Sequence, residues 1–544
     1  MGDTRTAKAK CRMGVPGCPN GEPDTLLPVE IVHVEEQRGG RRGISPLPPP
    51  LAAALVFLAS GAVLVLEVVG LRLVGPYLGV TLQTSSAVIG VALAAIAYGA
   101  WSGGWLADRA DPRRLLAPAL LLAAAATAVT LPVVRWAGEL LRGSASGGIL
   151  LLTALAVFVP AALLSAIPPL VVKLQLGDVR QTGRVVGRLS SIGTLGAITA
   201  TLGTGFVLVA ALPTSVILLG LAVVLGTAGI GLGAYLWRAG HDAAAVPPPA
   251  DRTKAALAIL VLAGAGLTTL APDPCDVETA YHCARVVTDP DRPTGRLLLL
   301  NSARHSYVDL ADPRHLEFAY TQWIGAFVDG YAPVGRPLRT LHVGGGGFTL
   351  PRYLSATRPG SSNVVLELDG ELVDLDRVKL GVQSGPGLEI WVGDARIGLA
   401  RQSAAAYDVV IGDAFGHLVV PWHLATLEMT REVRRVLRPA GAYALNVIDY
   451  PPARFVRAEL ATIMAVFPHV ALMAPPAAIA GLLGANFVIL ASDAPLALEA
   501  LRPRLTGLAE RVSLLTGAEL TAFVGGARVL TDDYAPVDQL LTNP

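Results

Sequence analysis

The chain has 544 residues, of which 52% are hydrophobic and only 16% are charged, and its formal net charge is +1. That composition is too apolar for an ordinary soluble enzyme and predicts a membrane part joined to a soluble part. The near-neutral charge gives no support for a nucleic-acid partner. The four cysteines include no CxxC pair and have no histidine cluster beside them, so the sequence argues against a zinc site.

Residues 1–50 are polar, rich in glycine and proline, and end in SPLPPP, so we expect a disordered tail. No apolar core follows the early basic residues, which argues against a cleaved signal peptide. Residues 51–272 instead predict a transmembrane domain of six or seven helices. Six apolar segments reach the roughly 20 residues that a bilayer-spanning helix needs, and a seventh, at residues 255–271, is shorter. The six are residues 51–71, 85–107, 115–134, 149–172, 189–212 and 216–237.

The positive charges of the membrane part predict its orientation. They gather in the N-terminal tail and after the second, fourth and sixth apolar segments, which puts the N-terminus of this multi-pass cell-membrane protein in the cytoplasm. The sequence allows the soluble domain on either side of the membrane. If residues 255–271 cross the membrane, the rest of the chain lies outside, where Cys275 and Cys283 could form a disulfide. If they do not cross, the soluble domain is cytoplasmic, which suits a nucleotide-derived substrate. Two unrelated thiols are the alternative to the disulfide.

Glu67 lies inside the first apolar segment, and Arg72 lies near the end of that segment. An ionisable group in a bilayer costs at least about 2.5 kcal/mol on insertion scales, so we expect Glu67 to face the interior of the helix bundle beside a partner. Two roles remain open for Glu67, namely handling of protons or cations and a structural ion pair or hydrogen bond.

The soluble half begins with a small β-rich subdomain at residues 273–336, and residues 337–544 then alternate between strands and helices. This alternation with short connections predicts an α/β doubly wound, Rossmann-like domain with a parallel sheet. A later strand at residues 486–491 is expected on the edge of the sheet. The expected parallel strands are residues 339–343, 364–368, 388–392, 407–411 and 442–447.

The stretch LRTLHVGGGGFTLPRYL at residues 338–354 predicts a strand, a turn without side chains and the start of a helix. The turn consists of Gly344, Gly345, Gly346 and Gly347. Such a unit brings backbone N–H groups and a helix N-terminus close to a nucleotide-type ligand, although a glycine cluster is often only a tight turn. The glycines alone do not distinguish NAD from an S-adenosyl ligand.

Three acidic residues fall at the carboxyl ends of the following strands, where this fold places ligands. Glu367 ends the second strand, 20 residues beyond Gly347, where a carboxylate can accept hydrogen bonds from both ribose hydroxyls. Asp394 ends the third strand in VGDA, and Asp413 ends the fourth in VVIGDAF. A carboxylate at the third strand end, placed to meet an adenine amino group, is typical of methyltransferase-type folds.

Four motifs in this order, HVGGGGFTLPRYL, VVLELD, VGDA and YDVVIGDAF, resemble those of the polyamine aminopropyltransferases, the spermidine synthases. Three others, SGAVLVLEVVGLRL, ETAYHCARVV and LTDDYAPVDQLL, resemble the bacterial members that are fused to a multi-helix membrane module. The resemblance covers roughly residues 51–540 and is most specific over residues 275–450.

The resemblance implies a role for each residue of the nucleoside site. Glu367 would bind the ribose of decarboxylated S-adenosylmethionine, which is the co-substrate in this family, and Asp394 with Ala395 would hold the adenine. The four glycines would pass beneath the methionine-derived tail, and His282 would lie beside the nucleoside. Asp413 matches the acid that takes the proton from the attacking amine. Neither a tightly bound cofactor nor a metal is implied.

The departures from the family pattern concern the amine acceptor. Gly347 stands where the family has an acid, the second acid after Asp413 is missing, and Tyr320-Thr321-Gln322 replaces Tyr-His-Glu. The nucleoside half of the site is therefore kept and the half that grips a dicationic polyamine is eroded. Candidates for contacting the acceptor are Tyr281, Asp309, Glu317, Tyr320, Gln322, Asp532 and Asp533, of which the last two could also be a capped surface turn.

The leading hypothesis is aminopropyl transfer to an amine or polyamine, with Asp413 as general base and with putrescine doubtful as the acceptor. One alternative is a methyltransferase that uses S-adenosylmethionine itself. Another is a transporter or sensor whose soluble domain binds a nucleoside or polyamine without catalysis. The expected partners are the lipid bilayer, a small amine and, as one candidate assembly, a second copy in a homodimer.

Overall fold

The computed structural model describes residues 47–144, 146–176, 181–240, 266–268, 270–416, 419–508 and 510–541. The disordered tail predicted for residues 1–50 lies almost wholly outside these ranges. Most of the seventh apolar segment, at residues 255–271, lies outside them as well.

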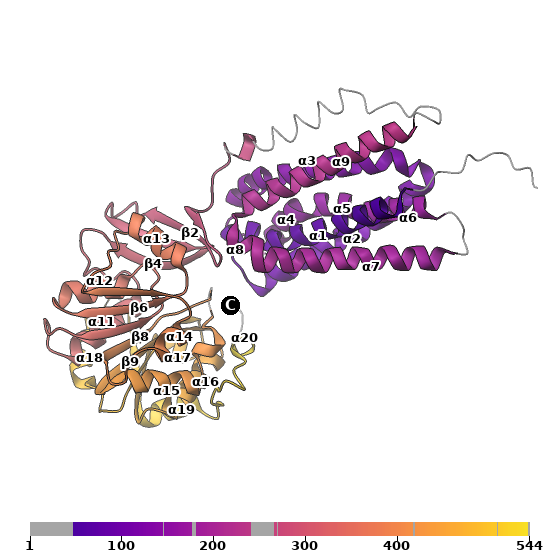
Figure 1. The fold of residues 1–544 in the computed structure, drawn as a ribbon. Helices are drawn as coiled ribbons and strands as arrows, with labels where there is room; N and C mark the ends of the chain where they lie inside the picture. Colours follow the sequence, from indigo (N-terminus) through magenta and orange to yellow (C-terminus); the bar gives the residue numbers. More distant parts are fainter. Residues whose placement is uncertain are drawn as a thin grey trace, which may run out of the picture. The chain divides into compact units, whose positions relative to one another are not determined.

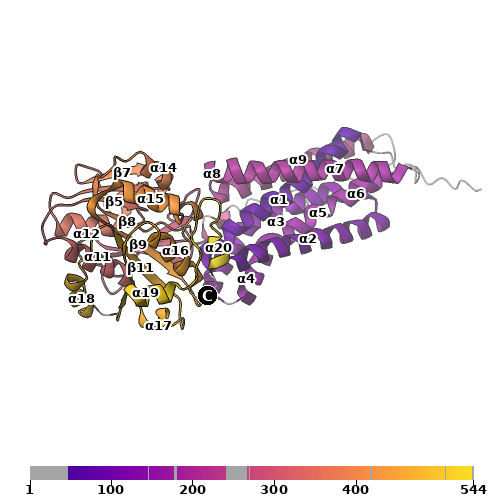
Figure 2. The same cartoon turned by 90° about the horizontal axis from the view of Figure 1, so that it is seen from below.

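Six helices among the described residues are long and apolar enough to cross a membrane, and they confirm the six predicted segments. The chain is therefore a multi-pass membrane protein (Figures 1 and 2). The fourth span contains a π-helical turn at Ala154–Phe158, and the fifth contains one at Thr204–Leu208. The helices are α1 (Pro49–Leu78), α2 (Leu82–Arg109), α3 (Pro112–Leu141), α4 (Ser146–Thr153), α5 (Val159–Ser165), α6 (Ile167–Gln175), α7 (Thr182–Gly203), α8 (Val209–Ala211) and α9 (Thr214–Gly240).

Glycines let the membrane helices approach backbone to backbone. A Cβ atom on Gly196 of α7 would lie 2.4 Å from the carbonyl oxygen of Phe57 in α1, and one on Gly99 of α2 would lie 2.2 Å from that of Ala162 in α5. Such contacts stabilise helix pairs in lipid, where burial of apolar surface gives no preference for helix over lipid. The partner predicted for Glu67 is not found, since within the described ranges Glu67 makes no hydrogen bond or ion pair.

Four strands within residues 277–309 form an antiparallel sheet, and one helix follows it in the chain. The sheet order is β1-β2-β3-β4, and β3 and β4 form a hairpin whose register shifts at Leu298/Leu299. Its elements are β1 (Val277–Glu278), β2 (Cys283–Thr288), β3 (Gly295–Leu300), β4 (Ala303–Asp309) and α11 (Ala319–Tyr331).

The second sheet has eight strands in the order β12-β10-β11-β9-β8-β5-β6-β7, and strands β5 to β9 pair in parallel as predicted. The last three strands pair antiparallel. The predicted edge position of the strand near residue 490 is wrong, because β11 lies between β9 and β10. Strand β10 pairs with β11 on the side away from β9, and β12 pairs with β10. The strands are β5 (Arg339–Val343), β6 (Ser362–Glu367), β7 (Leu388–Val392), β8 (Tyr407–Gly412), β9 (Leu437–Asp449), β10 (His469–Ala474), β11 (Ala485–Ser492) and β12 (Ser513–Thr516).

Helices cover both faces of this sheet (Figure 1), so its central strands are apolar on both sides. In β8, Val410 packs into one core with α15 and α16, while Val409 and Ile411 pack into the other with α11 and α12. This is the doubly wound arrangement that the sequence predicts. The helices are α12 (Thr349–Thr357), α13 (Gly370–Lys379), α14 (Ala395–Ala400), α15 (Leu427–Val436), α16 (Arg454–Met464), α17 (Pro476–Ile479), α18 (Leu498–Thr506), α19 (Gly517–Val524) and α20 (Val537–Leu540).

Candidate functional site

The glycine turn after β5 lies against the carboxyl end of β8. The Asp413 N–H group donates to the carbonyl oxygen of Val343 at 2.8 Å, which joins the two strand ends. Gly344 has φ +96°, and a Cβ atom there would lie 2.3 Å from the carbonyl oxygen of Asp413. Only glycine fits this position, because both the backbone conformation and the space exclude a side chain. The turn therefore brings Asp413 next to the glycines.

Glu367, at the end of β6, is held in place by backbone N–H groups. Its Oε2 atom accepts from Gly345 at 2.7 Å and from Gly346 at 3.2 Å, and its Oε1 atom accepts from Asp369 at 3.0 Å. A carboxylate has about four acceptor positions, so one remains for a ligand. Burial raises the pKa of Glu367, while the three N–H donors act against that rise. The glycine N–H groups thus orient an acid that lines a cavity.

Asp413 sits at the end of β8 with both carboxylate oxygens engaged. Its Oδ2 atom accepts from the Tyr320 hydroxyl at 3.0 Å, and its Oδ1 atom accepts from Asn446 Nδ2 at 2.8 Å. Asn486 Nδ2 donates in turn to Asn446 Oδ1 at 3.0 Å. Burial raises the pKa of Asp413 to about 6, against these two hydrogen bonds, which lower it. Asp413 is therefore ionised at neutral pH but is a stronger base than an exposed aspartate.

Two cavities meet at Asp413. The first has a volume of about 370 Å³ and is lined by Gly344, Gly346, Glu367, Asp394 and Ala395. We call it the nucleoside cavity, after the ligand that the sequence predicts for these residues. The second, which we call the acceptor cavity, has a volume of about 400 Å³. Both are lined by His305, Asp413 and Phe415. The acceptor cavity is further lined by Arg304, Glu317, Tyr320, Asn446, Asn486 and Glu510.

Asp394 is fixed by a helix end and by a histidine. Its Oδ1 atom accepts the N–H groups of Arg396 and Ile397 at the start of α14, at 2.9 and 3.1 Å. Its Oδ2 atom lies 3.0 Å from Nε2 of His423, which follows β8 in the loop that leads to α15. Both side chains line the nucleoside cavity. The end of that cavity beside α14 therefore contains a carboxylate and an imidazole in contact.

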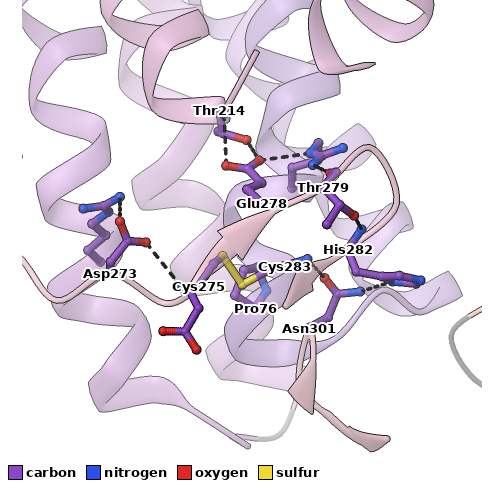
Figure 3. The surroundings of a disulfide bond; sticks show 12 residues. Pro76, Thr214, Asp273, Cys275, Glu278, Thr279, His282, Cys283 and Asn301 are labelled. Carbon is purple, nitrogen blue, oxygen red and sulfur yellow. Dashed lines mark hydrogen bonds and ion pairs between the residues drawn. A yellow bond between two sulfur atoms is a disulfide. The ribbon is translucent and has the colours of Figure 1, made fainter. Parts of the chain in front are cut away.

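Tyr281 and His282 reach the nucleoside cavity from the segment before β2. Cys275 and Cys283 form a disulfide across this segment, and Asn301 accepts the Cys283 N–H at its Oδ1 atom (Figure 3). The Asn301 Nδ2 atom lies 3.4 Å from His282 Nδ1. The disulfide therefore closes the segment that carries two cavity residues. The sequence alone left open whether these cysteines pair.

Several predicted acceptor residues have other partners. Gln322 donates to the carbonyl oxygen of Leu316 at 2.8 Å and supports a turn. Asp309 pairs with Arg292 at 2.8 Å, and Asp532 forms a two-pronged ion pair with Arg396. These three side chains and Asp533 do not line either cavity in the described part of the chain. Their contact with an acceptor therefore stays a prediction.

The sequence reasoning missed four polar residues of the site, His305, His423, Asn446 and Asn486. The sequence does mark the two asparagines, because each is a polar residue within an otherwise apolar strand. Asn446 lies in LNV of β9, and Asn486 lies in NFV of β11. No comparable pattern marks His305. It is half-buried, its Nδ1 atom lies 2.9 Å from the Ser306 hydroxyl, and burial together with His282 lowers its pKa to about 4. The ring is therefore neutral where the two cavities meet.

Part of this chain is similar to known proteins. No protein-family model matches the chain. A polyamine aminopropyltransferase from Vibrio vulnificus (strain CMCP6) is 28% identical over 134 residues, which are 24% of this chain and 44% of the Vibrio protein. The chain thus spans less than half the length of that curated relative.

Two solved structures are similar over a larger share of this chain. A probable spermidine synthase from Corynebacterium glutamicum ATCC 13032 is 30% identical, with 48% of this chain and 96% of that chain covered and a TM-score of 0.45. A spermidine synthase in complex with the transition state analogue AdoDATO is 17% identical, with 44% and 80% covered and a TM-score of 0.31. The 30% identity over nearly all of the corynebacterial protein carries the assignment. This chain belongs to the spermidine synthase-like, polyamine aminopropyltransferase family, with its soluble domain joined to membrane helices.

Proposed function

We propose that this protein transfers an aminopropyl group from decarboxylated S-adenosylmethionine to an amine acceptor. The observation that carries the proposal is the position of Asp413, whose carboxylate lies where the nucleoside cavity meets the acceptor cavity. A base at that junction faces the nucleophile from one side and the electrophile from the other, as positioning catalysis requires.

The reaction forms a bond from the amine nitrogen to the propyl carbon and breaks the bond from that carbon to the sulfonium sulfur. The electron pair of the broken bond stays on sulfur, and a neutral thioether nucleoside leaves. The protonated form of a free amine has a pKa of about 10, so most of the amine is protonated at neutral pH. A group in the site must therefore take a proton from it. We assign that step to Asp413, whose raised pKa makes it a better base.

The acceptor cavity supports an amine substrate even though the family acids are missing. Glu317 and Glu510 line this cavity together with Asp413. Both glutamates lie outside the sequence motifs that resemble the family. The loss of the acid at position 347 has a steric explanation. A Cβ atom on Gly347 would lie 2.9 Å from Ser306 Cβ, so the turn has no room for a side chain.

The nucleoside cavity favours the decarboxylated co-substrate over S-adenosylmethionine itself. The carboxylate of S-adenosylmethionine needs a cation or free N–H groups, but no described residue that lines this cavity is lysine or arginine. The N–H groups of Gly345 and Gly346 are bound by Glu367, and that of Gly347 donates to Ser306. A methyltransferase activity is therefore less well supported.

We further infer that the N-terminus is cytoplasmic and that the soluble domain is outside. Glu278 accepts hydrogen bonds from Arg72, near the C-terminal end of α1, and from Thr214, the first residue of α9. The basic segments after the second, fourth and sixth spans lie at the other end of the helix bundle, and the positive-inside rule assigns that end to the cytoplasm. The Cys275–Cys283 disulfide suits an oxidising compartment and supports the same side.

An outside location favours a second candidate function, in which the soluble domain binds a nucleoside or polyamine and the membrane helices transport it or signal. In that case Asp413→Asn would leave function intact and Glu67→Gln would abolish it, whereas the enzyme predicts the opposite. Sidedness is measured by introducing Val334→Cys, which is exposed, and labelling intact cells with a membrane-impermeant maleimide. Labelling is expected, and protection until lysis would contradict an outside domain.

The enzyme is tested by calorimetry on the full chain in detergent, with decarboxylated S-adenosylmethionine and S-adenosylmethionine as paired ligands. We expect tighter binding of the decarboxylated form and loss of that binding in Glu367→Ala. Mass spectrometry of candidate amines incubated with the protein then detects an added aminopropyl group. Absence of nucleoside binding would overturn the proposal.

A further inference from the structure

The base end of the nucleoside cavity contains a histidine that no part of the proposed reaction uses. His423 lies in the short 3-10 turn Trp422–Leu424, between β8 and α15, and its ring contacts the Asp394 carboxylate. Asp394 and His423 are each about one third exposed toward the cavity, at 34% and 30%. The pair is therefore within reach of a bound base.

We propose that His423 determines the base specificity of this site by fixing the Asp394 carboxylate, and that the Arg396–Asp532 ion pair positions His423. This inference rests on the proposed nucleoside site and adds to it the residues that select the base. Asp532 is outside the cavity, so it is a positioning residue and touches no ligand.

The hydrogen-bonding capacity of Asp394 explains the selection. Two acceptor positions on Oδ1 are filled by the N–H groups of Arg396 and Ile397, and one on Oδ2 is filled by His423. One acceptor position on Oδ2 remains. Because an ionised carboxylate only accepts, that position takes an amino group of a purine and repels the carbonyl oxygen of a 6-oxo purine.

His423 is needed for this geometry because it restricts the rotation of the carboxylate. With Oδ1 held by α14 alone, Oδ2 would be hydrated, and a water molecule could bridge to a 6-oxo group. With His423 in place, the Nε2 atom occupies that side of Oδ2 at 3.0 Å. Since the carboxylate accepts, Nε2 carries the proton in this contact.

Contacts to the rest of the fold hold His423 in position. Its carbonyl oxygen accepts from Arg396 Nη1 at 2.9 Å. The same guanidinium group binds both oxygens of Asp532, at 2.7 and 2.5 Å. The Asp532 N–H group donates to Glu428 at 3.0 Å, which joins the turn near the C-terminus to the start of α15. Bidentate pairs of this kind fix geometry as well as adding stability.

The arrangement gives the LTDDYAPVDQLL segment a function different from the predicted one. Asp532 binds Arg396 and lines neither cavity in the described part of the chain. It acts through Arg396 and the backbone of His423 on a carboxylate that faces the base. The two predicted features, the carboxylate of VGDA and the acid of TDDYAP, are therefore parts of one network.

The test compares a 6-amino nucleoside with its 6-oxo analogue. The probes are 5′-deoxy-5′-methylthioadenosine and 5′-deoxy-5′-methylthioinosine, and calorimetry on the full chain in detergent measures the ratio of their Kd values. In the unsubstituted protein we expect at least about tenfold preference for the amino form, as expected for a hydrogen bond to a charged group. In His423→Ala the ratio should fall about tenfold toward one.

Two further variants separate specificity from folding. His423→Gln keeps an N–H donor near the position of Nε2 and should restore most of the preference. His469→Ala, at the start of β10 and outside the cavity, is the matched control and should leave the ratio unchanged. A loss of stability alone would not change the ratio of two affinities measured on the same folded protein.

The positioning role of Asp532 is tested by a double-mutant cycle. Asp532→Asn should lower the ratio in the unsubstituted background and have no further effect in His423→Ala, because it acts through the histidine. An unchanged ratio in His423→Ala would overturn this inference while leaving the nucleoside site intact. If neither nucleoside binds the unsubstituted protein, both this inference and the proposed function are wrong.

Discussion

The Tyr320 hydroxyl donates a hydrogen bond to Asp413 Oδ2 at 3.0 Å, and this contact joins α11, which packs on one face of the large sheet, to the end of β8. The tyrosine therefore stabilises the ionised form of the acid that we assign as general base. Burial acts in the opposite direction and is the larger effect, so the pKa of Asp413 is about 6. The balance between burial and hydrogen bonding sets the pH range in which Asp413 can accept a proton.

The pH dependence of catalysis should report this balance. Below pH 6 Asp413 is protonated and cannot accept the amine proton, so kcat/KM should fall tenfold per pH unit on the acid side. Tyr320→Phe removes a hydrogen bond that lowers the pKa, so the acid limb should move to higher pH. Tyr353→Phe, whose hydroxyl binds Asp329 outside both cavities, is the control and should leave the limb in place. If kcat/KM of the unsubstituted protein began to fall only near pH 4, Asp413 with its raised pKa would not be the general base.

Nucleoside binding should depend on Glu367 and not on Asp413. Glu367→Gln replaces an acceptor by an amide that faces the N–H groups of Gly345 and Gly346, and it removes the charge that we propose to bind the ribose. We expect about 10- to 100-fold weaker binding by calorimetry, the range for hydrogen bonds to charged groups. Glu371→Gln, on the exposed side of α13, is the matched control. Asp413→Asn should bind nucleoside normally and lose turnover by roughly 10²- to 10⁴-fold. Loss of binding in Asp413→Asn would mean that this acid is needed to bind the nucleoside and would contradict a role in proton transfer alone.

The parts of the site that sequence predicts best are those fixed by local backbone rules. The glycine turn and the strand-end acids Glu367, Asp394 and Asp413 follow from strand and turn patterns, and all three acids line the predicted cavity. Residues brought in by tertiary packing were not predictable in this way. His305 and His423 come from a hairpin and a loop whose positions depend on the whole sheet. The edge assignment of β11 failed because strand order is not encoded in the apolar pattern of one strand.

Asp376 on α13 should make the stability of the domain decrease as the pH rises. Its side chain is fully buried, and neither carboxyl oxygen has a hydrogen-bond partner among the described residues. Burial, with Glu367 and Asp369 nearby, raises its pKa to about 9, well above the value of an exposed aspartate. The folded state therefore holds a proton that the unfolded state loses above pH 4. The free energy of unfolding should fall with pH in the window from about 4 to 9, by roughly 1 kcal/mol per pH unit.

The substitution Asp376→Asn removes this titration, so the stability gained over the unsubstituted protein should grow from pH 5 to pH 8. Denaturant unfolding of the full chain in detergent, followed through the soluble domain, measures it. Asp374→Asn, an exposed neighbour on the same helix that pairs with Arg377, should show no such growth. A gain that does not change with pH would mean that Asp376 is ionised in the folded protein.

The Cys275–Cys283 disulfide should stabilise the segment that carries Tyr281 and His282 into the nucleoside cavity. It closes a loop with a sequence separation of 8, for which the loss of unfolded-state entropy corresponds to roughly 2–3 kcal/mol. Reduction should therefore lower the unfolding temperature of the full chain and weaken nucleoside binding, because the loop gains freedom beside His282. The double variant Cys275→Ser/Cys283→Ser should behave like the reduced protein and should not respond to reductant, which separates the disulfide from general effects of the reagent. Equal unfolding temperatures with and without reductant in the unsubstituted protein would show that the bond adds nothing to stability.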